Sequence, residues 1–432
     1  FTLTRHAAED GNDSNGLYIH ESERDALYAG DLKLVNSGQG IDAYLTISME
    51  DYLYGVVAYE MSDSFPLEAL KAQAVAARTY AMRAKWNAGS REYDVVDTTA
   101  DQVYKGYDPI YTRVIQAVNE TRGIVGMANG TFAGCYYTAS NGGQVATPNQ
   151  IWGGDGDYGY IQQKDDPYDL ANPASPKRSF SVNASGTQSN AALQSLLNAK
   201  AAAAYGSGAS VTGVSNITPH TPKYASPSRL YTKMDFTVSY TLGGRSYTGR
   251  LTFDIFNELE GPMGMGINKG GNELWSVERT ANGFTVFARG YGHGVGMSQR
   301  GAMYMAQLGY TYDQILAFYF DGCRRVQYTL NRSILSPIVD GQDSTEEIIS
   351  VTPAPIDGAK DGSAVTVAET ALRSAPSGGE AIVTLPRGAS VTLCAAAGSD
   401  YLVAYGVLCG YVPQSAVTVY GGVPAYTDRT PT

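Results

Sequence analysis

Residues 49–61 read MEDYLYGVVAYEM, and residues 65–80 read FPLEALKAQAVAARTY. Apolar residues recur in both runs at the three- and four-residue spacing of one helix face. Pro66 is suited to opening the second helix, and the residue before it, Phe65, is held in an extended conformation. The sequence therefore predicts two consecutive helices in the first quarter of the chain.

Each predicted helix carries one charged residue on its apolar face. Leu53, Val57 and Glu60 share a face in the first helix, and Arg78 continues the apolar face of the second. A carboxyl on an apolar face is desolvated, which favours its neutral form, and a neutral carboxyl can donate a proton. The alternative is a buried Glu60–Arg78 ion pair that locks the helices together, because buried charges need partners. The spacing alone favours this structural alternative.

A glycine-rich segment, GYGHGVGMSQRGA at residues 290–302, is the second feature that could carry chemistry. Glycine allows positive φ angles and a close approach of the backbone to a ligand. Such a loop could direct backbone N–H groups and the side chains of His293, Ser298 and Gln299 toward one ligand. It is not a phosphate-binding loop, because no Gly-Lys-Ser/Thr follows. A tight structural turn is the alternative.

Two further segments are read together with these. Residues 136–143 read YYTASNGG, which alone would indicate an ordinary turn. Residues 160–169 read YIQQKDDPYD.

The four segments together resemble the stage II sporulation protein D family of bacterial peptidoglycan lytic transglycosylases. The resemblance covers most of residues 41–325 and implies that Glu60 is the catalytic acid and that Arg78 supports it. It also implies a set of glycan-binding residues, namely Ser140, Gly142, Gly143, Tyr160, Tyr291, His293, Ser298 and Gln299.

Three departures from the family pattern affect these assignments. Members commonly have Trp and Tyr where this chain has Tyr291 and Arg300, and Asn141 is an extra residue before the glycine pair. Many members have a lysine where this chain has Gln162, with Lys164 nearby, so no lysine role is carried over.

The family reaction requires only one carboxylate. Glu60 would protonate the glycosidic oxygen between muramic acid and glucosamine units and then act as the base for attack by the sugar's own 6-hydroxyl. The product is a 1,6-anhydro end, whereas ordinary glycosidases use two carboxylates. Asp63 is a candidate second carboxylate, although we expect it to cap the turn after Met61. The competing hypothesis is a non-catalytic glycan binder that enhances a cell-wall amidase.

Composition limits the class of partner. The 432 residues carry a net charge of -11, and only 17% are charged, which argues against nucleic acid as a partner. The 32 Tyr residues suit carbohydrate contact, because each ring has an apolar face and a polar tip. No apolar run is long enough to span a bilayer. Since Phe1 is no natural start, we expect that an export segment was removed and that the protein is extracellular and associated with the cell wall.

Four cysteines suggest disulfides in an exported protein. We expect Cys394 to pair with Cys409 and regard Cys135–Cys323 as a second candidate pair; free buried thiols are the alternative. Some relatives of the family hold a structural zinc ion, but Cys135 has no neighbouring Cys or His at ligand spacing. We therefore expect neither a metal nor a cofactor.

The remaining pattern predicts a mixed α+β domain over residues 1–335. Strands are expected at 30–38, 44–48 and 284–288, with a hairpin around Gly243-Gly244. Helices are expected at 111–120, 191–204 and 312–320, and a long loop at 147–176. Residues 336–363 are expected to be a linker, and residues 421–432 a tail. Short strands in residues 364–420, with the phrases LRSAP and GYVP, resemble a bacterial SH3-like barrel that binds the cell wall.

Overall fold

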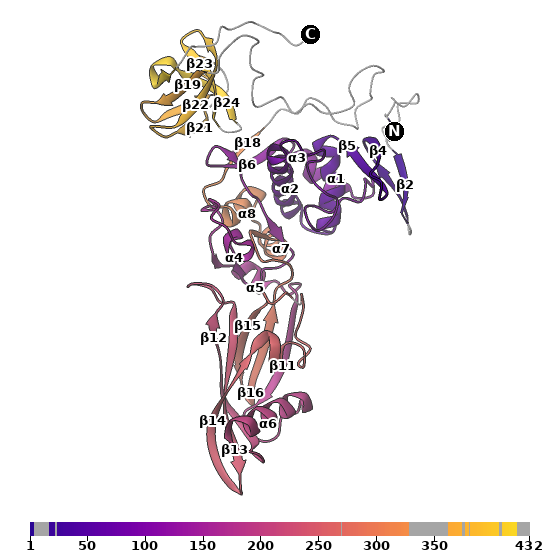
Figure 1. Cartoon of the computed structure of the whole chain (residues 1–432), viewed down its shortest axis with the longest axis vertical. Helices are drawn as coiled ribbons and strands as arrows, with labels where there is room; N and C mark the ends of the chain where they lie inside the picture. Colours follow the sequence, from indigo (N-terminus) through magenta and orange to yellow (C-terminus); the bar gives the residue numbers. More distant parts are fainter. Residues whose placement is uncertain are drawn as a thin grey trace. The chain divides into compact units, whose positions relative to one another are not determined.

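A computed structural model describes residues 1–3, 17–21, 24–268, 270–327, 362–373, 376–379, 381–405 and 408–420. The expected linker at 336–363 and the tail at 421–432 lie almost entirely outside these residues. Contacts divide the chain into two compact units (Figure 1). The first unit comprises Phe1–Cys135 and Gly322–Thr432, and the second comprises Tyr136–Asp321. The sequence did not indicate the second unit as a separate body.

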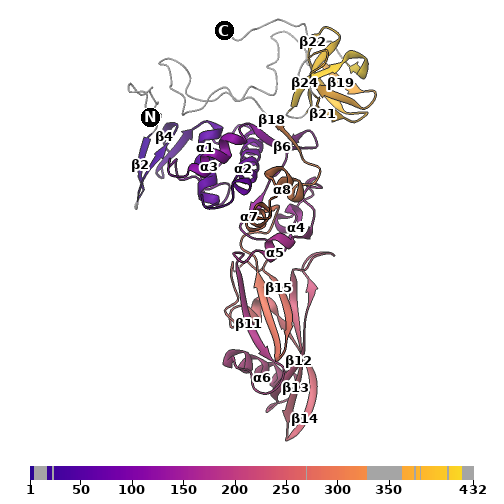
Figure 2. The same cartoon turned by 180° about the vertical axis from the view of Figure 1, so that it is seen from behind.

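Three helices form the centre of the first unit, and they lie side by side in Figures 1 and 2. They are α1 (Met49–Glu60), α2 (Leu67–Asn87) and α3 (Thr112–Glu120). Ser48 caps α1. Pro66 immediately precedes the first residue of α2, and the sequence predicts that it opens this helix. Gly55 allows α1 to approach a buried ring, because a Cβ at this position would lie 2.4 Å from an atom of Tyr104. The predicted helix pair is therefore confirmed.

Small antiparallel sheets flank these helices. One sheet has the order β1-β4-β5, a second pairs β2 with β3, and a third has the order β18-β6-β7. The strands are β1 (Thr2–Leu3), β2 (Leu17–Glu21), β3 (Arg24–Tyr28), β4 (Asp31–Asn36), β5 (Ile41–Thr46), β6 (Ile124–Ala128), β7 (Thr131–Phe132) and β18 (Arg324–Gln327). Since β18 pairs with β6, the chain returns to the first unit after completing the second.

The C-terminal part is all-β, as predicted. Its strands form one seven-stranded antiparallel sheet with the order β21-β20-β24-β23-β22-β19-β25. They are β19 (Gly362–Thr366), β20 (Thr370–Arg373), β21 (Ala381–Leu385), β22 (Ser390–Ala397), β23 (Asp400–Tyr405), β24 (Leu408–Pro413) and β25 (Val417–Tyr420). Among the described strands β21 and β25 remain edges, so the sheet does not close into the expected barrel. The likeness to SH3 domains stays a prediction.

Two three-stranded sheets and one helix form the main core of the second unit. The sheets have the orders β11-β16-β15 and β12-β13-β14, and α6 (Ala191–Tyr205) packs against the second. The strands are β11 (Lys177–Asn183), β12 (Ser210–Pro222), β13 (Tyr231–Leu242), β14 (Arg245–Asp254), β15 (Leu274–Thr280) and β16 (Gly283–Arg289); a π-helical turn (Ile255–Leu259) follows β14. The predicted hairpin is confirmed, with Gly243 and Gly244 both at positive φ.

Short helices and two-stranded ladders form the rest of the second unit. The elements are β8 (Tyr137–Thr138), β9 (Gln144–Val145), α4 (Pro148–Trp152), β10 (Lys164–Asp165), α5 (Pro167–Ala171), β17 (Met297–Ser298), α7 (Gln299–Gln307) and α8 (Tyr312–Tyr319). The expected long loop at 147–176 is wrong in part, because it contains α4 and α5. Thr147 and Asp166 cap these two helices, and a proline follows each cap.

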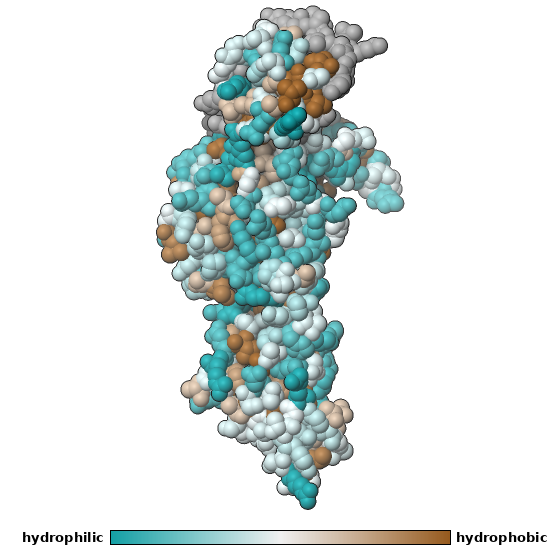
Figure 3. All heavy atoms as spheres, turned by 90° about the vertical axis from the view of Figure 1, so that its left-hand side faces the viewer, coloured by the Kyte–Doolittle hydropathy of each residue, from teal (hydrophilic) through white to brown (hydrophobic). Residues whose placement is uncertain are grey.

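None of the helices in the described residues is long and apolar enough to cross a membrane. On the face drawn in Figure 3, most of the second unit is hydrophilic, and its hydrophobic residues form small separate groups.

Candidate functional site

A buried ion pair joins the first two helices of the first unit. Arg78 in α2 is 1% exposed, and Glu50 in the first turn of α1 is fully buried. The guanidinium Nε and Nη2 donate to the two carboxylate oxygens of Glu50 at 2.8 and 2.6 Å. Its remaining bonds go to the backbone carbonyls of Ile124 and Val118. This two-pronged geometry is the strongest form of a carboxylate–guanidinium pair.

This pair corrects the sequence-based pairing of Arg78. Arg78 does point inward, as predicted, but its carboxylate partner is Glu50 and not Glu60. The N–H of Gly123 also donates to Glu50, at 3.2 Å, so the carboxylate is held by three donors. Glu50 was not expected from the sequence, although its signal was a carboxylate in the first turn of a helix with Leu53 and Tyr54 three and four positions later.

Glu60 has a different environment from Glu50. It is the last residue of α1 and is half-buried, while Leu53 and Val57 on the same face are fully buried. The C-terminal end of a helix carries partial negative charge, which disfavours a second negative charge nearby. Glu60 therefore lies at a helix end with part of its side chain accessible to solvent.

Tyr52, near the start of α1, packs in a group of buried aromatic rings. Tyr52 stacks on Tyr104 with ring centroids 5.5 Å apart, and its hydroxyl donates to Gln102 at 3.1 Å. Burial raises the pKa of Tyr52 well above its ordinary range, and the carboxylates of Asp101 and Glu60 add to the shift. Glu60 thus lies within electrostatic range of a tyrosine that stays neutral and hydrogen-bonded.

Asp63 caps helix α3, whereas the sequence led us to expect that it caps the turn after Met61. Its carboxylate accepts the N–H of Val114 in the first turn of α3, at 2.8 Å. The negative charge is favourable there, because helix N-termini carry partial positive charge. Asp63 is therefore engaged in joining the Ser62-to-Pro66 turn to α3.

In the second unit, the structure brings together two segments that the sequence placed far apart. Strand β8 pairs in parallel with β17, and Ser140 forms an antiparallel bridge with Tyr291. Two glycines make this contact possible: a Cβ at Gly292 would lie 2.3 Å from Thr138 Oγ1, and one at Gly296 would lie 2.1 Å from the carbonyl oxygen of Tyr136. The glycine-rich segment and the YYTASNGG segment therefore form one structural body.

Ser140 is buried inside this body. Its hydroxyl donates to the carboxylate of Asp169 in α5, with distances of 3.0 and 2.8 Å to the two oxygens. The N–H of Gly142 donates to the same carboxylate at 2.7 Å. Because Ser140 is 1% exposed, it holds the loop in place and is not positioned as a surface contact for a glycan.

A second aspartate of α5 holds the adjacent residue. Asp166 accepts the Asn141 amide at 2.8 Å and the Tyr319 hydroxyl at 2.7 Å. Burial raises the pKa of Asp166. Burial also raises the pKa of Tyr319, and the Asp166 carboxylate acts in the same direction. The extra Asn141 noted in the sequence thus joins the loop to α5.

His293 is a neutral, anchored side chain. Its Nδ1 accepts the N–H of Val295 at 3.0 Å, and the ring also bonds to the backbone of Tyr137. Burial lowers the pKa of His293 to about 4. At neutral pH the ring is therefore uncharged, and the bond at Nδ1 leaves that nitrogen unable to serve as a base. That His293 binds a glycan stays a prediction.

The other predicted glycan contacts differ in exposure. Ser298 is buried and caps α7 by accepting the N–H of Gly301 at 3.0 Å, and Gln299 begins the helix with little exposure. Tyr160 is also buried. Tyr291 is 50% exposed, so it alone of these four presents a ring to solvent.

Trp152 is an exposed aromatic residue that the sequence analysis missed. It ends α4 with 52% of its surface exposed, and its ring centroid lies 4.9 Å from Tyr136 and 5.0 Å from His293. The signal was available: a tryptophan, one of only 3 in the chain, followed by glycines and aspartates.

The structure places Gln162, which lies where many family members have a lysine, and the nearby Lys164, but it assigns a role to neither. Gln162 donates to Asp321 at 3.2 Å. Lys164 lies over the ring of Phe318, with its Nζ 4.2 Å from the centroid, and burial lowers its pKa.

The cysteines of the first unit differ from the expected pairing. Cys135 and Cys323 are both buried and are not bonded to each other as a disulfide. Burial raises the pKa of the Cys135 thiol, and the nearby Cys323 adds to this shift. The side chains of Cys394 and Cys409 lie outside the described part of the chain. Within the described part, no group of three or more His, Cys, Asp or Glu residues is placed to hold a metal ion.

Glu60 and Arg78 belong to the first unit, and His293 and Ser140 belong to the second. That all of them border one groove stays a prediction.

Comparisons with known proteins are consistent with the family resemblance. Residues 37–127, which include Glu50, Glu60 and Arg78, match the family described as Stage II sporulation protein. A Bacillus subtilis protein named Stage II sporulation protein D is 32% identical over 292 residues, which cover 64% of this chain and 74% of that protein. An uncharacterized protein of Brachyspira hyodysenteriae is 30% identical over 335 residues, covering 77% of this chain and 79% of that protein. The Bacillus subtilis amidase enhancer is 32% identical over 296 residues, but only 40% of its length is covered.

Proposed function

This chain belongs to the stage II sporulation protein D family, and we propose that it is a lytic transglycosylase that cleaves peptidoglycan glycan strands. The scissile bond joins N-acetylmuramic acid to N-acetylglucosamine, and the product carries a 1,6-anhydro-muramic end.

The environment of Glu60 carries this proposal. A general acid must be protonated at working pH and must reach the leaving oxygen. Glu60 is half-buried at the C-terminal end of α1, where the helix field favours the neutral form. Glu50, by contrast, is sealed and bound to Arg78.

The proposed step needs one carboxyl. Glu60 gives its proton to the glycosidic oxygen as the bond to the anomeric carbon breaks. The resulting carboxylate then takes the proton of the 6-hydroxyl as that oxygen bonds to the anomeric carbon, which restores the acid. The engagement of Asp63 with α3 supports a mechanism without a second carboxylate.

A second candidate function is favoured by one specific finding, the likeness to a protein named amidase enhancer. In this alternative the chain binds glycan strands without cutting them and assists a cell-wall amidase. Glu60 would then be a glycan contact and not an acid.

The proposal includes a location. We propose that the protein is exported and acts at the cell envelope, with the all-β C-terminal part as a wall-binding, SH3-like module. The family relatives named for sporulation and for amidase enhancement support an envelope role.

Product analysis separates the two functions. Purified glycan strands are incubated with the protein and the products are identified by mass spectrometry. New 1,6-anhydro-muramic ends are expected. Reducing ends would indicate a hydrolase, and unchanged strands would favour the amidase-enhancer alternative.

A further inference from the structure

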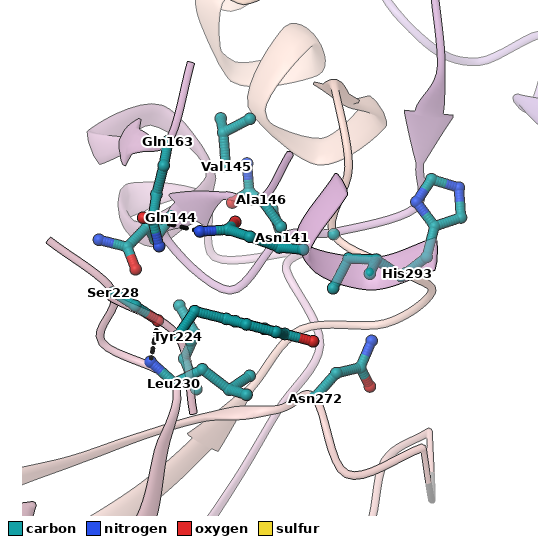
Figure 4. Close-up of a pocket in the computed structure, with 14 residues that line it drawn as sticks. Asn141, Gln144, Val145, Ala146, Gln163, Tyr224, Ser228, Leu230, Asn272 and His293 are labelled. Atoms are coloured by element: carbon teal, nitrogen blue, oxygen red, sulfur yellow. Dashed lines mark hydrogen bonds between the residues drawn. The ribbon is translucent and has the colours of Figure 1, made fainter. Parts of the chain in front are cut away.

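The second unit contains a small pocket beside His293 (Figure 4). Its volume is about 30 Å³, and a water molecule needs roughly 10–15 Å³ of such space. The pocket therefore accommodates a small group of a ligand and not a whole sugar ring. Segments from α4, β9, β15 and the 223–230 connection contribute to its wall.

The described residues that line the pocket carry no charge, and they combine polar and apolar side chains. Five of them are amides, namely Asn141, Gln144, Gln150, Gln163 and Asn272. Tyr224 and Ser228 add hydroxyl groups, and the rest of the wall is largely aliphatic, from Val145, Ala146, Ile151, Leu230 and Leu274. His293 lines the pocket in its neutral form, since its pKa lies far below neutral pH.

Most of these polar groups are already engaged with the protein. Gln144 accepts the N–H of Arg229 at 2.7 Å and donates to Asp165 and to the carbonyl of Pro227. Asn272 donates to the carbonyl of Gly292 at 2.6 Å and accepts from Asn268. These bonds make the wall rigid, as a preformed ligand site requires.

Three groups retain hydrogen-bonding capacity. The oxygen of Gln163 accepts from Gln150 at 2.9 Å, but its amide nitrogen has no partner among the described residues. The hydroxyl of Tyr224 also has no hydrogen-bond partner among the described residues. The Ser228 hydroxyl oxygen accepts the N–H of Leu230, and its hydrogen has no acceptor among the described residues. Figure 4 shows the Tyr224 side chain lying across the pocket, with its hydroxyl directed toward Asn272.

Helix α4 connects this pocket to an exposed aromatic ring. Gln150 and Ile151 line the pocket, and Trp152 follows them directly with half of its surface exposed. The contact of Trp152 with His293 places the indole next to a pocket-lining residue. A flat ring near a small uncharged pocket of mixed polarity is suited to a ligand that has an apolar face and a short substituent with both a polar and an apolar end.

We infer that this pocket, together with Trp152, binds an N-acetylated amino sugar. The acetamido group enters the pocket, where the Gln163 amide and the Tyr224 hydroxyl bond to it, and the sugar ring packs against Trp152. The inference rests on the proposed function, because it assigns this site to the glycan of the wall. An uncharged pocket disfavours a free amine or a carboxylate, since burying an unpaired charge is costly.

Binding to three defined oligosaccharides tests the ligand class. The full-length protein carrying Glu60→Gln is titrated with N-acetylated chitotriose, deacetylated chitotriose and cellotriose, and binding is followed by calorimetry. We expect the acetylated trimer to bind at least tenfold more tightly than the other two. Equal affinity for all three, or tighter binding of the cationic deacetylated trimer, would overturn the inference.

Single substitutions test the residues. Trp152→Ala and Gln163→Leu are each expected to weaken binding of the acetylated trimer by about 3- to 10-fold, the loss typical of one packing or hydrogen-bonding contact. The control is Trp86→Ala, because Trp86 is 43% exposed and lies in α2 of the first unit. Undiminished binding in both pocket variants, with folding verified by circular dichroism, would contradict the assignment.

The outcome is separable from that of the proposed function. Binding is measured without turnover, so a protein that binds acetylated trimer but leaves glycan strands uncut supports the pocket and overturns the catalytic proposal. A protein that forms anhydro ends but binds the three trimers equally supports the catalytic proposal and overturns the inference about the pocket.

Discussion

The two ends of α1 carry glutamates that have opposite environments. Glu50, in the first turn, is fully buried and bound to Arg78 through both carboxylate oxygens. Glu60, the last residue, is half-buried. Along a helix these residues are about 15 Å apart. The buried glutamate is bound to an arginine and a backbone N–H, whereas the one at the helix end is partly exposed to solvent.

This difference teaches how one helix can serve both structure and chemistry. A charge that is buried and tightly paired is costly to disturb, so it holds elements together. A carboxyl at a helix C-terminus is disfavoured as an anion and retains a proton more readily. The proposed reaction of Glu60 is therefore tested by measuring a rate, and the structural role of Glu50 is tested by measuring the free energy of unfolding.

The largest effect is expected from Glu60→Gln. The amide keeps the shape of the side chain but has no acidic proton, so release of anhydro-muropeptides should slow by about 10²- to 10⁴-fold. The measurement is the initial rate on purified glycan strands. The free energy of unfolding should be nearly unchanged, because Glu60 is only half-buried.

Glu92→Gln is the matched control for this rate, because the Glu92 side chain is exposed in the same unit. Its rate should equal that of the unmodified protein. If Glu60→Gln releases anhydro products at the normal rate, Glu60 is not the general acid, and the two ends of α1 do not differ in the proposed way.

The second prediction concerns stability. Arg78→Ala leaves the Glu50 carboxylate buried without its partner, which typically costs about 3–5 kcal/mol in the free energy of unfolding. Arg78→Lys should recover only part of this loss, because an ammonium cannot reproduce the two parallel bonds. Urea denaturation measures both variants, and unchanged midpoints would refute the structural role of the pair.

The third prediction extends the contrast to the second unit through pH. Burial lowers the pKa of His293 to about 4, whereas an unfolded histidine titrates near 6.5. Above pH 6.5 the ring is neutral in both the folded and the unfolded state, and its contribution to the free energy of unfolding is fully present. As the pH falls from 6.5 toward 4, only the unfolded state takes up the proton, so stability decreases by up to about 3 kcal/mol.

Urea denaturation at several pH values between 7 and 5 tests this titration. His293→Gln should flatten the decrease, because a glutamine can accept the Val295 N–H without titrating. His220→Gln is the control, since His220 in β12 is partly exposed beside Asp235. Identical slopes for the unmodified protein and His293→Gln would contradict the assignment.

The smallest effect is expected from Ser140→Ala. The substitution removes one hydrogen bond to the buried Asp169 carboxylate, which should lower the free energy of unfolding by about 1.5–3 kcal/mol. Ser189→Ala, at an exposed hydroxyl, should change it by no more than about 0.5 kcal/mol. If Ser140→Ala instead weakens glycan binding at unchanged stability, Ser140 is a substrate contact and not a loop anchor.

Local pattern predicted much of the fold correctly. The helices at α1, α2, α3, α6 and α8, and the hairpin at Gly243-Gly244, follow from spacing, caps and turn residues that lie within a few positions of each other. The short helices α4 and α5 were missed because five-residue helices carry no periodic signal, although Thr147-Pro148 and Asp166-Pro167 marked their starts.

The sequence by itself determined that Arg78 points inward, that His293 sits in a glycine-rich loop, and that Glu60 ends a helix face. Only the tertiary structure decided that Arg78 binds Glu50, that His293 is neutral, and that Ser140 is bonded to Asp169. The physical reason is that helical spacing constrains direction within one element, whereas the partner of a buried charge depends on which distant segment packs against it. Two glutamates ten residues apart look alike in sequence, and burial distinguishes them.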